Sequence, residues 1–282
     1  MSDSRKTAIV TGASQGIGAG IATRFATAGA RVVVHYRRDR QAAKHVVARI
    51  KAAGGTAVAI TAKLDTEAGV ASFFAEADDR LGPADILINN AGQNFPLHPL
   101  EEISLDEWQA MFRDNVESMF LATRAAAAVM RERGGGAIVN IGSISASNPA
   151  SDHSHYNSAK AAVLAFTRSS AQELGPAGIR VNCVSPGLIH KAGIEKAWPE
   201  GVERWLARVP LGRLGEAEDV ADACLFLASP AARWDSLPVA RAEQGPGASY
   251  PALRETRTLR RLALPGGRLG LLVFVRGLGS RL

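Results

Sequence analysis

The stretch TAIVTGASQGIG, residues 7–18, decides the fold of this chain of 282 residues. Its apolar start predicts a short buried strand, and the glycine-rich turn after it opens a helix whose apolar residues recur at helical spacing. Such a turn is common without a ligand, but its glycines also let the backbone approach a phosphate, whose charge the start of a helix attracts. In this context we predict a nucleotide site formed by Gly12, Ser14, Gln15, Gly16, Ile17 and Gly18.

Strands and helices alternate over the first 232 residues. Further strands are expected at 31–35, 57–62, 86–89, 137–141 and 180–184, and helices at 40–53, 67–80, 104–131, 155–174 and 216–228. Because these strands are short and almost continuously apolar, they predict a parallel sheet covered by helices on both faces. The predicted fold is a doubly wound, Rossmann-like α/β sheet, in which ligands bind beyond the carboxyl ends of the strands.

Composition excludes several other classes of protein. The chain has 46% hydrophobic and 21% charged residues, and none of its apolar runs approaches the length of a membrane helix. The first residues lack the pattern of a secretory signal, and Cys183 and Cys224 stand too far apart in the sequence for a metal or redox pair. His153 and His155 are close to Tyr156 in the sequence and could face the substrate. They have no acidic neighbour at ligand spacing, so we interpret them as polar loop residues. We therefore expect a cytoplasmic protein without a metal site.

Further motifs follow the predicted strands in a fixed order. They are Asn89-Asn90-Ala91-Gly92, then Asn115, Ser143, the pair Tyr156 and Lys160, and Pro186-Gly187. Together with the G-x-x-x-G-x-G spacing of the first turn, this set resembles the short-chain dehydrogenase/reductase family over about residues 6–232. Within the family it resembles the single-domain branch that includes 3-oxoacyl-carrier-protein reductases and glucose dehydrogenases. The resemblance implies an oxidoreductase that interconverts a ketone and a secondary alcohol with a nicotinamide cofactor.

Tyr156, Lys160 and Ser143 suit the proton transfer that this reaction requires. A new alkoxide needs a proton, and a tyrosine hydroxyl exchanges one readily at neutral pH only when its phenolate is stabilised. Tyr156 and Lys160 are i and i+4 on one predicted helix, so the Lys160 ammonium can lie close to the Tyr156 phenol. If Ser143 were absent, we would interpret the pair as two solvated residues on a helix surface. Ser143 is expected to hydrogen-bond the substrate oxygen. The resemblance implies that Lys160 also holds the nicotinamide ribose and that Asn115 supports a chain of water molecules.

The residues after the second strand predict the choice of cofactor. An NAD site places an acid there for the ribose hydroxyls, whereas the 2′-phosphate of NADP needs a cation. This chain has Arg37 and Arg38 there and no acid before Asp39, so we predict that the cofactor is NADP(H). Use of NAD(H) is the alternative. The non-functional interpretation is that both arginines are solvated loop residues. The resemblance implies adenine or adenosine contacts for Asp65, Asn90, Ala91 and Gly92, and nicotinamide-side contacts for Pro186, Gly187 and Ile189. The family usually has threonine where this chain has Lys191.

Residues 233–282 differ in composition from the rest of the chain. They contain nine arginines, no lysine and three acidic residues, so the whole formal net charge of +6 falls in this tail. The last strand of the family and its T-G and D-G-G motifs are missing, and the composition resembles GC-rich DNA translated out of frame. We therefore predict a catalytic domain at 1–232 and an atypical tail whose last strand is altered or missing. The alternatives are an extension in which residues 269–275 restore the strand, or an anion-binding tail.

Two other functional hypotheses stay open at this point. One is an NAD-dependent sugar or polyol dehydrogenase, and the other is a nucleotide-binding family member whose altered tail has impaired catalysis. We expect a small carbonyl or alcohol substrate, for which residues 188–210 stand at the position of the family's lid. We expect no membrane or nucleic-acid partner, because the basic excess is confined to the tail. A homodimer or homotetramer is expected if another segment replaces the last strand.

Overall fold

A parallel β-sheet forms the centre of the computed structural model, which describes residues 5–93, 97–236 and 239–241. In these ranges the sheet has seven strands in the order β3-β2-β1-β4-β5-β6-β7, and all pairs are parallel. The strands are β1 Thr7–Val10, β2 Arg31–Tyr36, β3 Thr56–Thr61, β4 Ile86–Asn89, β5 Gly136–Ile141, β6 Ile179–Ser185 and β7 Val239–Arg241. The strand order reverses between β1 and β4, so their carboxyl ends form the switch point where such sheets bind ligands.

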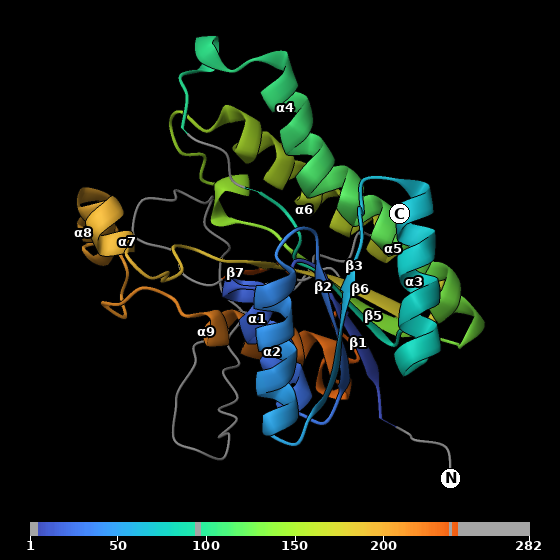
Figure 1. Cartoon of the computed structure of the whole chain (residues 1–282). Coiled ribbons are helices and arrows are strands. Elements are labelled where there is room, and N and C mark those ends of the chain that lie inside the picture. Colours follow the sequence, from blue (N-terminus) through green and yellow to red (C-terminus); the bar gives the residue numbers. More distant parts are fainter. Residues whose placement is uncertain (1–4, 94–96, 237–238, 242–282) are drawn as a thin grey trace, which may run out of the picture.

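Helices cover both faces of the sheet, which confirms the predicted doubly wound fold (Figure 1). Alternate strand residues face opposite ways: Val32 and Val34 pack with α1, α2 and α9, whereas Val33 packs on the other face with α3, α5 and α6. None of the helices in the described ranges combines the length and apolar character that crossing a membrane requires. The helices are α1 Gly16–Thr27, α2 Arg40–Ala52, α3 Glu67–Leu81, α4 Leu105–Phe112, α5 Ser118–Glu132, α6 Ser154–Leu174, α7 Ile194–Ala197, α8 Pro199–Leu206 and α9 Ala217–Ala228.

The predicted helix at 104–131 is interrupted in its middle. Between α4 and α5 the residues Arg113–Glu117 form a π-helical turn. Turns of this kind are rare and are frequently found at functional sites. This one carries Asp114 and Asn115, which contact residues that follow β2 and β4. The break therefore brings two polar side chains to the carboxyl edge of the sheet.

After α9 the chain returns along the open edge of β6. The Asn182 side chain donates a hydrogen bond to the carbonyl oxygen of Asp235 at 2.9 Å, and the Val181 N–H donates to Ser236 Oγ at 3.4 Å. Beyond these contacts, β7 pairs with residues 183–185 of β6. The last strand is thus present but only three residues long, and contacts continue past the predicted boundary at 232. The predictions for residues 242–282, including a strand at 269–275, lie outside the described residues.

His35, in β2, supports the glycine-rich turn between β1 and α1. Its Nδ1 accepts a hydrogen bond from the Gly12 N–H at 3.0 Å, and its Nε2 lies 3.2 Å from the Ala62 carbonyl oxygen. These partners assign the ring proton to Nε2. The imidazole is 3% exposed, and its burial lowers the pKa to about 4, against the opposing effect of the hydrogen bond to Ala62. The fold therefore requires a neutral His35, because protonation of Nδ1 removes the acceptor for Gly12.

We predict that acid destabilises the fold through His35. The unfolded imidazole binds a proton below about pH 6.5 and the folded one only near pH 4, so the free energy of unfolding should fall as the pH drops between these values. The expected loss from this group is about 3 kcal/mol. Urea denaturation across this range measures it, and His35→Asn, which keeps an acceptor for Gly12, should flatten the dependence. His45→Asn, at an exposed position in α2, is the matched control, and an unchanged slope in His35→Asn would contradict the prediction.

Candidate active site

The turn between β1 and α1 is shaped to receive an anion. Gly12 and Gly16 adopt left-handed φ angles of +61° and +54°, which favour glycine. A Cβ atom at Gly18 would overlap the Gly12 carbonyl oxygen, so the helix packs directly on the turn. Gln15, at the N-cap position, is extended, and no described side chain caps the helix. With Ser14 and Ile17 half-buried at its rim, the start of α1 offers free N–H groups of the kind that bind phosphate.

Asn90 and Thr11 fasten this turn to the end of β4. The Asn90 Nδ2 donates to the carbonyl oxygens of Thr11 and Gly12, both at 2.9 Å. In return, Thr11 Oγ1 accepts from the backbone N–H groups of Asn90 and Ala91, also at 2.9 Å. Asn90 and Ala91 were predicted only as adenosine contacts. Their bracing role was missed, because it depends on a partner that is about eighty residues away in the chain.

Tyr156 and Lys160 lie on one face of α6, as their spacing predicts. The Lys160 Nζ is 5.6 Å from the centre of the Tyr156 ring and donates a hydrogen bond to the Ile141 carbonyl oxygen at 3.0 Å. Ser143 is buried just beyond β5, and its Oγ accepts from the Ser145 N–H at 3.1 Å. The short 3-10 turn Ile144–Ala146 that it caps packs against α6. The structure therefore brings the three predicted residues to the adjoining ends of β5 and α6.

Asn115 approaches the same region from the π-helical turn. Its Nδ2 donates to the carbonyl oxygens of Gln93 at 2.9 Å and Met111 at 3.1 Å. Its Oδ1 is buried and has no hydrogen-bond partner among the described residues. Gly92 lies between this oxygen and Lys160, because a Cβ there would stand 3.8 Å from Lys160 Nζ and would crowd Asn115 Oδ1. An unpaired buried acceptor is costly, so this position suits a bound water molecule.

The segment after β6 lies next to the turn that follows Ser143. The Pro186 carbonyl oxygen accepts a hydrogen bond from the Ile144 N–H at 3.1 Å, which ties Pro186 to the turn after Ser143. Gly187 and Ile189 are half-buried, and Ile189 forms a parallel bridge with Gly215. Lys191 is exposed on the loop that follows. The predicted nicotinamide-side residues thus adjoin the Ser143 turn.

The interpretation of His155 as a polar loop residue was wrong. His155 is the second residue of α6 and is fully buried; burial lowers its pKa, and Glu107 opposes this effect. His153 precedes the helix, with its ring centre 5.4 Å from that of Tyr156. Glu107 comes from α4, and no local pattern in the sequence indicates that it lies near His155. Within the ranges that the structure describes, no group of three or more His, Cys, Asp or Glu side chains is placed to hold a metal ion.

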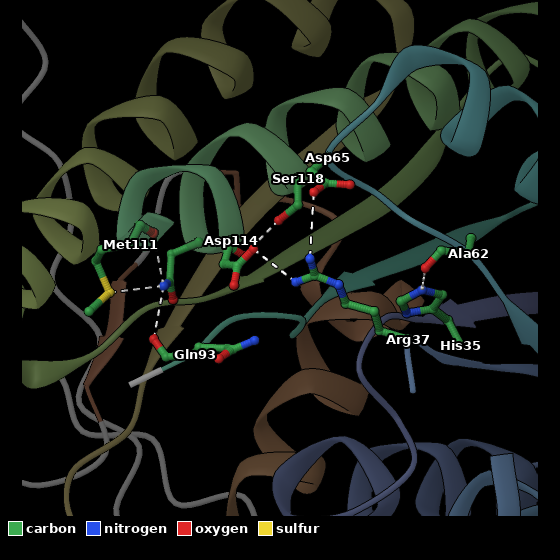
Figure 2. A network of polar contacts seen from close by, with 9 residues as sticks. His35, Arg37, Ala62, Asp65, Gln93, Met111, Asp114 and Ser118 are labelled. Atoms are coloured by element: carbon green, nitrogen blue, oxygen red, sulfur yellow. Dashed lines mark hydrogen bonds and ion pairs between the residues drawn. The ribbon is translucent and has the colours of Figure 1, made fainter. Parts of the chain in front are cut away.

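Arg37 follows β2 directly and is held by two carboxylates (Figure 2). Its Nη1 lies 3.0 Å from Asp114 Oδ1, and its Nη2 lies 3.6 Å from Asp65 Oδ2. Asp65 Oδ1 is buried without a partner among the described residues. Arg37 and Asp65 therefore lie at the predicted edge of the sheet, but their ion pair was not predicted, and Asp114 was missed. The uncapped helix, the tight packing at Gly18 and the unpaired oxygens of Asp65 and Asn115 together fit a dinucleotide.

The chain is similar to known proteins in sequence and in fold. A family model described as enoyl-(acyl carrier protein) reductase matches residues 12–236. The 7alpha-hydroxysteroid dehydrogenase of Escherichia coli (strain K12) is 40% identical over 232 residues, which cover 82% of this chain and 90% of that relative. The L-rhamnose 1-dehydrogenase (NAD(P)(+)) of Azotobacter vinelandii is 41% identical over 238 residues, which cover 81% of this chain and 91% of that relative. A solved structure of 7 alpha-hydroxysteroid dehydrogenase complexed with NADH and 7-oxo glycochenodeoxycholic acid superposes with a TM-score of 0.79 at 37% identity, covering 84% of this chain and 92% of that chain. With its motifs, its sheet order and these matches, the chain belongs to the short-chain dehydrogenase/reductase family of oxidoreductases, which act on CH–OH and C=O groups.

Proposed function

We propose that this enzyme interconverts a ketone and a secondary alcohol, prefers NADP(H) over NAD(H), and uses Tyr156 to exchange the proton on the substrate oxygen. The observation that supports the proton transfer is the position of the Lys160 ammonium, 5.6 Å from the centre of the Tyr156 ring. A cation at this distance stabilises the phenolate that forms when the proton leaves. When bound, the nicotinamide supplies or accepts the hydride. The proposed catalytic domain comprises residues 1–232.

Three side chains divide the work around the substrate oxygen. Ser143 Oγ already accepts a hydrogen bond from the Ser145 N–H, so its own hydrogen is free to be donated to the substrate. Tyr156 then gives its phenolic proton to that oxygen during reduction and takes it back during oxidation. Lys160 spends one of its three N–H groups on Ile141, which leaves two for a ribose or a water molecule. A water molecule on the buried Asn115 Oδ1 would belong to a chain of water molecules that carries replacement protons from solvent to Lys160.

The NADP(H) preference is proposed from the surroundings of Arg37. The glycine-rich turn and the start of α1 would hold the pyrophosphate, and the unpaired Asp65 Oδ1 would accept a hydrogen bond from the adenine amino group. Arg37 borders a hollow of about 530 Å³ to which Arg38 and Arg40 also contribute. Cations around a hollow of this kind favour a phosphate over a hydroxyl group. The 2′-phosphate would therefore bind beside Arg37, at the rim of this hollow.

We predict that Tyr156→Phe abolishes turnover and leaves the affinity for the cofactor nearly unchanged. The substitution removes the exchangeable proton but keeps the ring, and general acid–base catalysis of this kind contributes roughly a hundredfold or more. NADPH absorbance over a panel of ketones measures turnover, and calorimetric titration measures binding. Activity near that of the parent enzyme, in a variant with the same thermal stability, would rule out Tyr156 as the proton donor.

We also predict that Arg37→Glu raises the Michaelis constant for NADPH at least roughly tenfold more than that for NADH, because it replaces a cation by an anion where the phosphate binds. Initial rates with the two cofactors give both constants. Arg168→Glu, at an exposed position on α6, makes the same change of charge as a control. An equal effect of Arg37→Glu on both cofactors would contradict the phosphate contact.

A further inference from the structure

The ion pairs of Arg37 join three elements that are distant in sequence. Arg37 follows β2, Asp65 lies in the loop after β3, and Asp114 belongs to the π-helical turn (Figure 2). The carboxylate side chains are 16% and 11% exposed, so both are shielded more than ordinary surface pairs. Within the described part of the chain, neither carboxylate pairs with a second cation. Two anions therefore share one guanidinium, and the cluster has an excess of one negative charge.

Asp114 is the more firmly placed of the two anions. Its backbone carbonyl oxygen accepts a hydrogen bond from Ser118 Oγ at 2.8 Å. The next residue, Asn115, is anchored by hydrogen bonds to Gln93 and Met111. Its carboxylate is also closer to Arg37 than that of Asp65, at 3.0 Å compared with 3.6 Å. A ligand that binds to Arg37 must therefore lie close to the negative charge of Asp114, since the π-helical turn leaves the Asp114 side chain little freedom to move away.

NADP(H) and NAD(H) differ in the group that would meet this cluster. The 2′-phosphate carries negative charge, so the two carboxylates repel it while Arg37 attracts it. A 2′-hydroxyl group is neutral and donates a hydrogen bond, which a carboxylate accepts. The chain has no acid directly after β2, where an NAD site has one, but the fold supplies one from the π-helical turn. The same carboxylate thus disfavours one cofactor and suits the other.

We propose that Asp114 is a specificity-determining residue that weakens the binding of 2′-phosphorylated cofactor and supports NAD(H), so that the enzyme uses both. Arg37 favours the phosphate, and Asp114 limits that preference. This inference rests on the proposed contact between Arg37 and the 2′-phosphate. It assigns the balance between the cofactors to a charge that is 77 residues away in the sequence from Arg37, at the usual position after β2.

The test uses 2′,5′-ADP and 5′-AMP, which carry the adenosine ends of NADP and NAD, as calorimetric probes of the full chain. Asp114→Asn keeps the size of the side chain and an oxygen for Arg37 but removes the charge. The affinity for 2′,5′-ADP relative to 5′-AMP should rise about tenfold. In turnover assays of Asp114→Asn, the Michaelis constant for NADPH should fall relative to that for NADH, while kcat should stay the same with both cofactors. Asp65→Asn should change the ratio in the same direction and serves if Asp114→Asn folds poorly.

Two further variants separate the possible outcomes. Asp222→Asn removes a carboxylate from the exposed ion pair with Arg24 and should leave the ratio unchanged. If Arg37→Gln does not weaken binding of 2′,5′-ADP, the proposed phosphate contact fails, and this inference fails with it. If Arg37→Gln weakens that binding while Asp114→Asn leaves the ratio unchanged or lowers it, the contact stands and the role of Asp114 is overturned. A lowered ratio would mean that Asp114 positions Arg37 for the phosphate.

Discussion

The hydrogen bonds that Asn90 and Thr11 exchange between β1 and β4 hold the glycine-rich turn in a shape that leaves the start of α1 open. On the opposite side, His35 from β2 accepts the Gly12 N–H. Because β1 lies between β2 and β4, the turn is fixed from both neighbours. Its carbonyl oxygens are used by these braces, while the N–H groups at the helix start stay available for an anion. The proposed pyrophosphate contact depends directly on the shape of this turn.

The π-helical turn links the two halves of the site. Asp114 contacts Arg37 at the proposed adenosine end, and Asn115 points its unpaired oxygen toward the side of Gly92 and Lys160. Two consecutive residues therefore serve different parts of one ligand site. A regular helix turns by about 100° per residue, so a wider turn changes which neighbours are presented together. The π-helical turn lies within a helix that otherwise continues from α4 into α5, at the point where this helix passes the sheet edge.

The fold, and the meeting of Ser143, Tyr156 and Lys160 at one edge of the sheet, could be predicted from the sequence because their signals are local. Apolar runs, glycine turns and the i, i+4 pair of Tyr156 and Lys160 are all visible within a few residues. The ion pair of Arg37 with Asp114 joins positions that are 77 residues apart, and local patterns cannot show such pairing. The π-helical turn was also missed, since its residues keep a helical polarity pattern. An altered or missing last strand was expected because the family's T-G and D-G-G motifs are absent, but the position of β7 at 239–241 depends on its pairing with β6.

The contacts of residues 235 and 236 with β6 have a consequence for the outer edge of the sheet. An unpaired edge strand offers its backbone N–H and C=O groups to strands of other molecules. Here β7 pairs only with the last three residues of β6. Before them, Ser236 Oγ accepts a hydrogen bond from the Val181 N–H, and the Asp235 carbonyl oxygen accepts one from the Asn182 side chain. Irregular chain thus blocks part of an edge that a longer strand would otherwise cover. The Val181 N–H is therefore not available to a strand of another molecule.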